Sequence, residues 1–320
     1  MRFDENAELD TSRIDDQRGS GGGGGSPLGG RVALGGGGLG IVGLIIFFLI
    51  SALGGGGTTT GGGGLGGGLA LPSGLSGLSS GQSTDNSQIA QSCRTGADAN
   101  RSVDCEVTAV LNSLDGYWSD AFSRSGQTFR APRTNFFNGQ VSTGGCGSAT
   151  SDVGPFYCPG DSEIYIDLSF FQELQTRFGA QGGPFARAYV IAHEYGHHIQ
   201  NLLGTNRQVR AGDSGPTSGS VRLELQADCY AGVWGNHATT TPTSSGRPLI
   251  TDVDQADIKA ALDTASRIGD DYIQSNLGGG RVDQSQFTHG SSAQREKWFS
   301  TGIRTGDPAQ CNTFTTNNLG

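Results

Sequence analysis

Half of the glycine in this chain lies in its first quarter, which limits where a folded core can form. Residues 1–85 hold 28 of the 56 glycines, and residues 32–84 include no charged side chain. The other residues, about 235 in number, are enough for one domain with a sizeable core. The glycines follow no Gly-X-Y repeat, which excludes a collagen-like triple helix.

The net charge and the cysteines narrow the class of protein further. The formal net charge of −9 argues against a nucleic-acid-binding protein, which normally carries a basic patch. The six cysteines are enough for three disulfides in an oxidising compartment, with buried free thiols as the alternative. The simplest of the 15 possible connectivities joins them in chain order: Cys93 with Cys105, Cys146 with Cys158, and Cys229 with Cys311.

An apolar run near the amino terminus predicts a membrane anchor. Residues 39–53 read LGIVGLIIFFLISAL, and uncharged glycines on both sides can extend the run toward the roughly 20 residues that a span needs. We therefore expect one transmembrane helix at residues 37–57. A cleaved signal-peptide core is the alternative, although the segment before the run is long for a leader.

The basic residues around this run predict its orientation. Arg13, Arg18 and Arg31 precede it, and no further Lys or Arg follows before Arg94. The positive-inside rule then places the amino terminus in the cytoplasm. The sequence therefore predicts four parts in chain order: a glycine-rich cytoplasmic tail (1–36), the span (37–57), a Gly/Ser-rich tether (58–85) and an extracytoplasmic domain (86–320).

Apolar periodicity predicts mainly helices in the outer domain. Helical stripes run through residues 105–122, 221–234 and 258–268, whereas residues 163–168 alternate as in a half-buried strand. Cap signals add three helices: from Ser169, with Gln172, to about Phe178; from Pro184 to Leu203 before Gly204; and from Ser291, with Gln294, to about Ile303. The expected fold class is α+β, mainly helical, with one small sheet.

The predicted helix at residues 184–203 carries the motif that points to chemistry. His193, Glu194 and His197 form HExxH. Residues i and i+4 lie one above the other on a helix face, so both imidazoles can reach one zinc ion. Glu194 is one step round the helix, near enough to contact a water molecule on that metal.

A catalytic zinc site needs a third protein ligand and an open fourth position. The metzincin pattern would require Gly and His after His197, but Gln200 and Leu203 stand there. The gluzincin pattern requires an acid on a following helix, and Glu224 and Asp228 supply two acids at i and i+4. We expect Glu224 to bind zinc and Asp228 to accept a hydrogen bond from a ligand histidine. The alternative is two exposed helix carboxylates.

The remaining histidines and one glycine carry weaker signals. His198 points elsewhere on the helix, so we expect a structural role, and we expect His237 at the surface. Gly196 in mid-helix costs about 1 kcal/mol relative to alanine, which indicates either a close approach of another backbone or a tolerated glycine. In a peptidase, His289 or Arg295 could stabilise the oxyanion; ordinary salt bridges are the alternative for both.

At these residues the sequence resembles the bacterial putative neutral zinc metallopeptidase family, single-span proteins with an outer zinc-peptidase domain. The resemblance covers most of residues 105–314 and the amino-terminal tail, although the tail and tether are much richer in glycine here. It rests on CGSATSDVGPFYCPGDSEIYIDLSFF, FARAYVIAHEYGHHIQNLLG, VRLELQADCYAGVWG, FTHGSSAQREKWF and GDPAQCNTF. It implies a zincin-like fold with His193 and His197 as ligands, Glu194 as the catalytic acid, Glu224 in the place of the third gluzincin ligand, and a role for His289.

These observations predict a membrane-anchored zinc endopeptidase with one Zn²⁺ per chain and a protein or peptide substrate. Glu194 would act as general base on a zinc-activated water, and zinc with His289 would hold the oxyanion. The strand at residues 163–168 would bind the substrate as an added strand. Two alternatives stay open: a non-catalytic, zinc-stabilised scaffold of the bacterial cell envelope, and a zinc amidase acting on cell-wall peptides.

Overall fold

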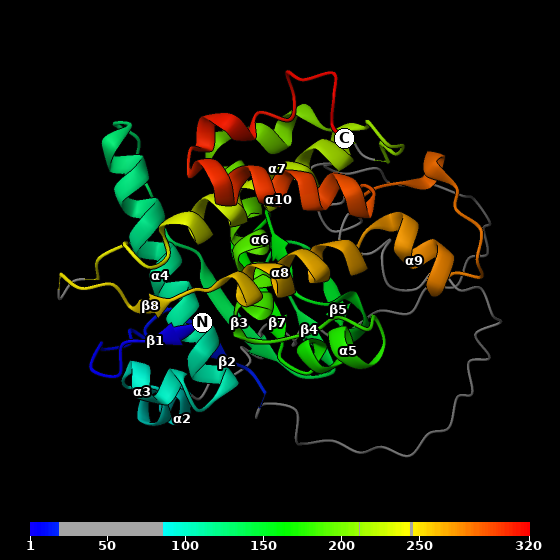
Figure 1. The fold of residues 1–320 in the computed structure, drawn as a ribbon. Helices are drawn as coiled ribbons and strands as arrows, with labels where there is room; N and C mark the ends of the chain where they lie inside the picture. The colour runs from blue at the N-terminus through cyan, green and yellow to red at the C-terminus, as the bar shows by residue number, and fades with distance from the viewer. Residues whose placement is uncertain (19–85, 211, 244–245) are drawn as a thin grey trace, which may run out of the picture.

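The computed structural model describes residues 1–18, 86–210, 212–243 and 246–320 (Figure 1). The predicted span at residues 37–57 and the predicted tether at residues 58–85 lie outside these ranges. Within them, no helix is both long enough and apolar enough to cross a membrane. The fold is α+β, as the sequence predicts, with helices packed around small sheets.

Helices are the main regular structure of the described domain, and α6 lies at its centre. Figure 1 shows α7 and α10 side by side next to α6, and α6 also packs against α4 and α8. The longer helices are α4 (Val103–Arg124), α6 (Pro184–Leu203), α7 (Gly219–His237), α8 (Gln255–Arg267) and α10 (Ser292–Thr305). The shorter ones are α2 (Ser87–Ser92), α3 (Gly96–Ala99), α5 (Phe170–Thr176) and α9 (Asp270–Asn276).

Most of the helix ends follow the cap signals in the sequence. α6 has the expected bounds, and Gly204 after it adopts the left-handed conformation with φ 73°, which few other residues reach without strain. Ser291 and Gln294 form the expected capping box of α10. The capping box expected at Ser169 does not form, because the Ser169 hydroxyl donates to Asp167 instead.

The described strands form three small sheets rather than the single sheet that was expected. The largest has the order β2–β3–β7–β6, with β6 antiparallel to its neighbour and the other three strands parallel. Its strands are β2 (Ile14–Asp16), β3 (Arg133–Phe137), β7 (Glu163–Asp167) and β6 (Phe156–Cys158). The two-stranded sheets pair β1 (Arg2–Phe3) with β8 (Ile250–Asp252) and β4 (Gln140–Ser142) with β5 (Ser148–Thr150). Strands this short carry too few residues for a clear alternation in the sequence.

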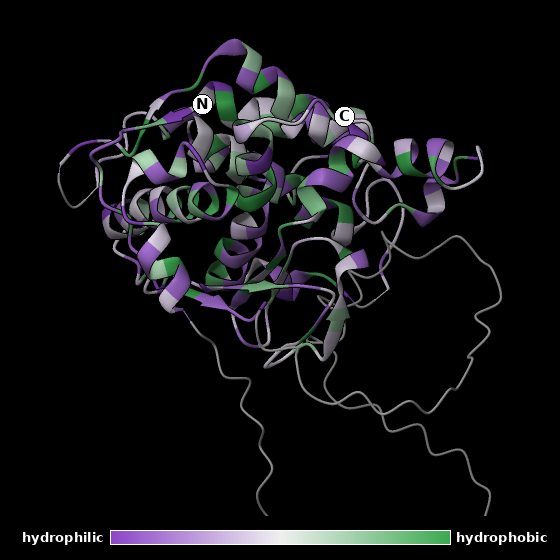
Figure 2. Ribbon diagram, turned by 90° about the horizontal axis from the view of Figure 1, so that it is seen from below, coloured by the Kyte–Doolittle hydropathy of each residue, from purple (hydrophilic) through white to green (hydrophobic). Residues whose placement is uncertain are grey.

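The core forms where the apolar faces of the helices meet. Figure 2 shows hydrophobic and hydrophilic residues interleaved along the helices, as amphipathic packing requires. On α6 the side chains of Ala188, Ile191, Tyr195 and Ile199 are completely buried. This packing fixes the rotation of α6 about its axis, and therefore the direction in which its HExxH residues point.

Residues 1–18 are part of the folded domain, which corrects the expectation of a separate tail at residues 1–36. Phe3, Ala7 and Ile14 are buried in the main core. β2 extends the largest sheet beside β3, where Arg133 donates two hydrogen bonds to Asp15, at 2.5 and 2.6 Å. The sequence alone hardly predicts this packing, because the apolar residues of the segment are widely spaced and its two strands have only two and three residues.

The three disulfides confirm the chain-order pairing. Cys93–Cys105 joins the end of α2 to α4, and Cys146–Cys158 closes a short loop at β6. Cys229–Cys311 ties α7 to the carboxy-terminal segment across 82 residues. Because a cross-link stabilises most when it closes a long loop, the third bridge is expected to contribute most to the stability of the helical part.

The packing of the amino-terminal segment can be tested on Ile14, which is 2% exposed. We expect Ile14→Ala to lower the free energy of unfolding by about 2–5 kcal/mol, because it leaves a cavity in the core. The matched control, Glu5→Ala on an exposed position, should change it by less than about 0.5 kcal/mol. Denaturant unfolding of the full chain measures both, and equal stability of Ile14→Ala and wild type would contradict this packing.

Candidate metal centre

Two closely packed helices, α6 and α7, bring the predicted ligands together. They meet at Gly196, where an added Cβ would lie 2.9 Å from the Ala227 Cα and 3.0 Å from the Ala227 carbonyl oxygen. The glycine therefore allows a close approach of another backbone, which was one of its two predicted explanations. At this short separation Glu224 on α7 reaches both His193 and His197 on α6.

The spacing of the three side chains fits a zinc ion. His193 Nε2 lies 3.1 Å from one carboxylate oxygen of Glu224, and His197 Nε2 lies 3.3 Å from the other. Ligand atoms about 2.0–2.1 Å from a tetrahedral zinc are separated by about 3.3 Å. All three side chains are buried, their ligand atoms lie within 4.8 Å of one another, and His197 Nε2 makes no hydrogen bond. A buried nitrogen without a hydrogen bond is unusual, and a metal would satisfy it.

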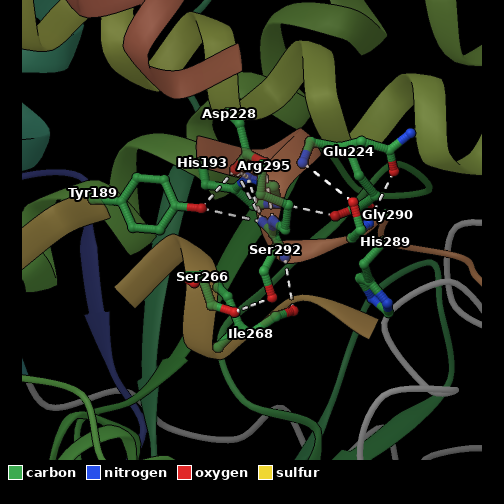
Figure 3. Close-up of polar contacts among 12 residues, drawn as sticks. Tyr189, His193, Glu224, Asp228, Ser266, Ile268, His289, Gly290, Ser292 and Arg295 are labelled. Atoms are coloured by element: carbon green, nitrogen blue, oxygen red, sulfur yellow. Dashed lines mark hydrogen bonds and ion pairs between the residues drawn. The ribbon is translucent and has the colours of Figure 1, made fainter. Parts of the chain in front are cut away.

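Asp228 lies behind His193, one helical turn after Glu224 (Figure 3). Its Oδ1 is 2.8 Å from His193 Nδ1 and accepts a hydrogen bond from the Tyr189 hydroxyl at 2.6 Å. Arg295 of α10 donates to both oxygens of Asp228, each at 2.9 Å. With its proton on Nδ1, His193 presents Nε2 toward Glu224, as a metal ligand must.

The charges around the ligands favour a cation. Burial disfavours the ionised carboxylate of Asp228, but Arg295 and His193 outweigh this effect and lower its pKa to about 2. Burial likewise disfavours protonated His193, yet Asp228 and Glu224 raise the pKa of this imidazole to about 10. Burial opposes ionisation of Glu224 too, but the two histidines hold its pKa well below the usual value. A site that stabilises positive charge so strongly also suits a divalent metal.

Gln200 orients the second histidine, a contact that the sequence analysis missed. Its Oε1 lies 2.9 Å from His197 Nδ1, and its Nε2 donates to the Leu223 carbonyl at 2.7 Å. Gln200 therefore links α6 to α7 and holds the His197 proton on Nδ1. The signal was present, because residues i and i+3 are neighbours on a helix surface.

Glu194 lies beside the ligands and is 3% exposed. Its Oε2 is buried and has no hydrogen-bond partner. Burial raises the pKa of Glu194, while His193 and His197 act in the opposite direction without cancelling the rise. An unpartnered carboxylate with a raised pKa is well suited to accept a proton and return it.

The two residues considered for the oxyanion occupy different environments. Arg295 is bound to Asp228, whereas His289 is buried at the pocket with an unpartnered Nε2. The Nδ1 of His289 lies 3.2 Å from Asp270, whose other oxygen accepts the backbone N–H groups of residues 288–290. Burial disfavours protonation, but Asp270 raises the pKa of His289. The sequence analysis missed Asp270, because the seven-residue helix α9 that it opens carries no clear periodicity.

The other two histidines lie away from the ligands. His198 is buried between the Tyr157 hydroxyl, 3.1 Å away, and the Arg130 carbonyl, 2.7 Å away. Burial lowers the pKa of His198 to about 4, which keeps it neutral at pH 7. His237 is half-buried rather than at the surface as expected, because its ring stacks on Tyr117 with centroids 5.0 Å apart.

Comparison with known proteins agrees with this site. The family model described as "Putative neutral zinc metallopeptidase" matches residues 1–314. The chain belongs to this family. An uncharacterized protein of Mycobacterium tuberculosis is 51% identical over 229 residues, which are 71% of this chain and 76% of that protein. The uncharacterized protein YpfJ of Escherichia coli K12 is 40% identical over 245 residues, which are 75% of this chain and 80% of YpfJ. No solved structure matches the chain significantly.

Membership of this family supports zinc as the metal and a peptidase as the general class of enzyme. The family model also spans residues 1–18 together with the domain. The segment that packs into the core therefore lies within the family region, rather than outside it as an appended tail.

The ligand set predicts how zinc binding responds to substitution. We expect one zinc ion per full-length chain, and at least about 100-fold weaker binding in Glu224→Ala, which loses a ligand. Asp228→Asn should weaken binding by about 10–100-fold, because it keeps all three candidate ligands but removes the charge that orients His193 and pairs with Arg295. Elemental analysis after dialysis against buffered zinc measures both.

Glu173→Ala on α5, outside the site, is the control for these variants and should bind zinc as wild type does. Equal zinc content in wild type and Glu224→Ala would remove Glu224 from the ligand set.

Proposed function

We propose that this protein is a zinc-dependent endopeptidase. The observation that carries the proposal is the position of Glu194, a buried carboxylate with one unbonded oxygen next to three buried ligand atoms. Structural zinc sites are usually closed by four protein ligands. The metal-ligand group found among the described residues has three, and a pocket opens beside it.

The residues around the metal would divide the reaction among them. Zinc, when bound, supplies a Lewis acid that lowers the pKa of water and polarises a carbonyl. Glu194 Oε2 takes up the proton lost by the attacking water and later delivers it to the leaving amine. His289 Nε2 donates a hydrogen bond to the carbonyl oxygen as negative charge develops there. Asp270 holds the His289 ring for this task.

The sequence analysis expected the substrate to bind as an added strand at residues 163–168, but this strand has no free edge. This strand, β7, has β3 on one edge and β6 on the other. β6 is one of the two edge strands of the described sheet, and it packs against α6. Val153 and Pro155, just before β6, line the pocket beside the ligands. We therefore propose β6 as the edge along which an extended substrate lies.

We propose that the domain works outside the cytoplasm, because three disulfides form stably in oxidising compartments. Residues 1–18 share its core, so we place them on the same side of the membrane. A single crossing at residues 37–57 would put residues 1–18 and 86–320 on opposite sides. We therefore propose that residues 1–18 lie outside the cytoplasm with the domain, in place of the expected cytoplasmic amino terminus, and we keep residues 37–57 as the proposed membrane attachment.

The catalytic role of Glu194 predicts a selective loss of activity. We expect Glu194→Gln to lower kcat/KM for unstructured peptides at least about 100-fold, because an amide of the same shape cannot accept the proton. Its zinc content should equal that of wild type. Mass spectrometry of a peptide mixture measures cleavage, and elemental analysis measures the metal.

The same assay separates the alternatives. Glu173→Gln on α5 is the matched control and should cleave as wild type does. No hydrolysis by zinc-loaded wild type, together with unfolding on chelation, would replace the proposal with a zinc-stabilised scaffold. Cleavage of cell-wall peptides alone would identify a zinc amidase. His289→Leu should lower kcat by about 10–1000-fold if His289 binds the oxyanion.

The placement of residues 1–18 can be tested in intact cells. We expect a membrane-impermeant maleimide to label Ser12→Cys and Thr176→Cys equally well, because both positions are exposed and lie on one folded body. Labelling of Thr176→Cys alone, with Ser12→Cys reacting only after lysis, would restore the cytoplasmic tail and contradict the packing of residues 1–18 on the domain.

A further inference from the structure

A pocket of mainly apolar lining opens directly beside the ligands. It holds about 570 Å³ of space, part of it open to solvent. His193, Glu194, Glu224 and His289 form its polar end. A group that fills this pocket would therefore touch the residues that surround the reacting carbonyl.

The rest of the pocket wall comes from several elements of the fold. Besides Pro155, its apolar side chains are Val153, Phe170, Phe178, Val190, Ile268 and Ile273. Those from helices lie on α5, α6 and α9, with Ile268 just after α8. The apolar wall therefore combines side chains from several distant parts of the sequence.

Val190 connects the apolar wall of the pocket to the residues proposed to act on the substrate. It lies three residues before His193 and four before Glu194 on α6, so the three side chains share one face of the helix. A substrate residue next to the attacked carbonyl would place its side chain against Val190. The pocket is thus within reach of the residue adjoining the cleaved bond.

The charges near the pocket select against a charged side chain. The lining includes one Lys or Arg side chain, Arg295, whose Nε and Nη2 already donate to Asp228 and whose Nη1 donates to the Ile268 carbonyl. A carboxylate from the substrate would find no uncommitted guanidinium here, and an ammonium group would lose water against an apolar wall. Burying an unpaired charge is costly, whereas burying an apolar side chain is favourable.

We propose that this pocket is the subsite that selects a large apolar side chain, such as Phe, Leu, Ile or Met, next to the bond that is cut. The inference rests on the proposed peptidase function and names its substrate class. Val190 of α6 and Ile273 of α9 contribute apolar side chains to its wall from two separate elements.

The first test is a set of peptides that differ at one position only, incubated with zinc-loaded full-length protein. We expect cleavage next to Phe, Leu, Ile or Met to have a kcat/KM about 10- to 100-fold higher than cleavage next to Ala. Asp or Glu at that position should prevent cleavage. Mass spectrometry of the products gives both the bond that is cut and the rate.

A charge placed in the wall should change this selectivity. Ile273→Asp should abolish the apolar preference and raise kcat/KM for Lys or Arg at the same position at least about fivefold, by pairing with the basic side chain. The matched control is Leu277→Asp, which also replaces an aliphatic side chain with a carboxylate, four residues later in the chain. Leu277 is 39% exposed and lies outside the pocket. This variant should keep the wild-type preference. A merely structural role of Ile273 would lower all rates together and would overturn the assignment.

A binding measurement separates the subsite from the peptidase function. Calorimetry compares 3-phenylpropanohydroxamic acid with acetohydroxamic acid, which share a zinc-binding group and differ in the apolar tail. We expect the phenyl compound to bind at least about tenfold more tightly to wild type and Leu277→Asp, but not to Ile273→Asp. Equal binding of the two compounds to wild type would overturn the subsite, even if peptides are cleaved. Selective binding with no cleavage of any peptide would keep the apolar pocket and reject the peptidase function.

Discussion

The close contact between α6 and α7 at Gly196 determines the geometry of the whole metal site. Any side chain larger than hydrogen would meet Ala227 of α7 at about 3 Å, so the two helices would have to move apart. Both candidate histidine ligands lie on α6, whereas Glu224 lies on α7 with its oxygens 3.1 and 3.3 Å from their Nε2 atoms. A separation larger by even 1 Å would break this match to the spacing of zinc ligands. Gly196 thus lowers the stability of α6 somewhat, but it allows the close helix contact that the site needs.

A second close contact extends the arrangement from α7 to α10. An added Cβ at Gly302 would lie 2.1 Å from the Cys229 carbonyl oxygen, so α10 can approach α7 only because this residue is glycine. The approach delivers Arg295 to Asp228 in the interior. Loss of one member of such a pair costs about 3–5 kcal/mol, since the other charge is left buried and unpaired. The ion pair in turn holds Asp228 against His193, so packing between α7 and α10 controls the orientation of this imidazole.

The sequence predicted best what depends on local periodicity. The bounds of α6, the capping box at Ser291 and the i, i+4 spacing of HExxH all follow from contacts within one helix. It predicted less well what depends on tertiary contacts. Asp270 and Gln200 act on the imidazoles of His289 and His197. Asp270 has no signal in the sequence, and the i, i+3 spacing of Gln200 from His197 is too common on helices to single it out. The strand at residues 163–168 was expected and is present as β7, but the other strands were missed, since strands of two to five residues are specified by their partners more than by their own pattern.

The amino-terminal segment has a direct connection to the metal helix. Arg13 lies 3.7 Å from Asp115 of α4, and Asp115 accepts a hydrogen bond of 2.5 Å from Tyr195, one of the two residues inside HExxH. Burial raises the pKa of Asp115 to about 6, and Arg13 partly offsets that rise. Removing Arg13 would therefore leave this carboxylate harder to ionise and weaken its interaction with the Tyr195 hydroxyl. Tyr195 packs on the core side of α6, opposite the ligands. Residues 1–18 thus support the rear of the helix that carries the site, which explains why a segment far from the metal belongs to the same folded unit.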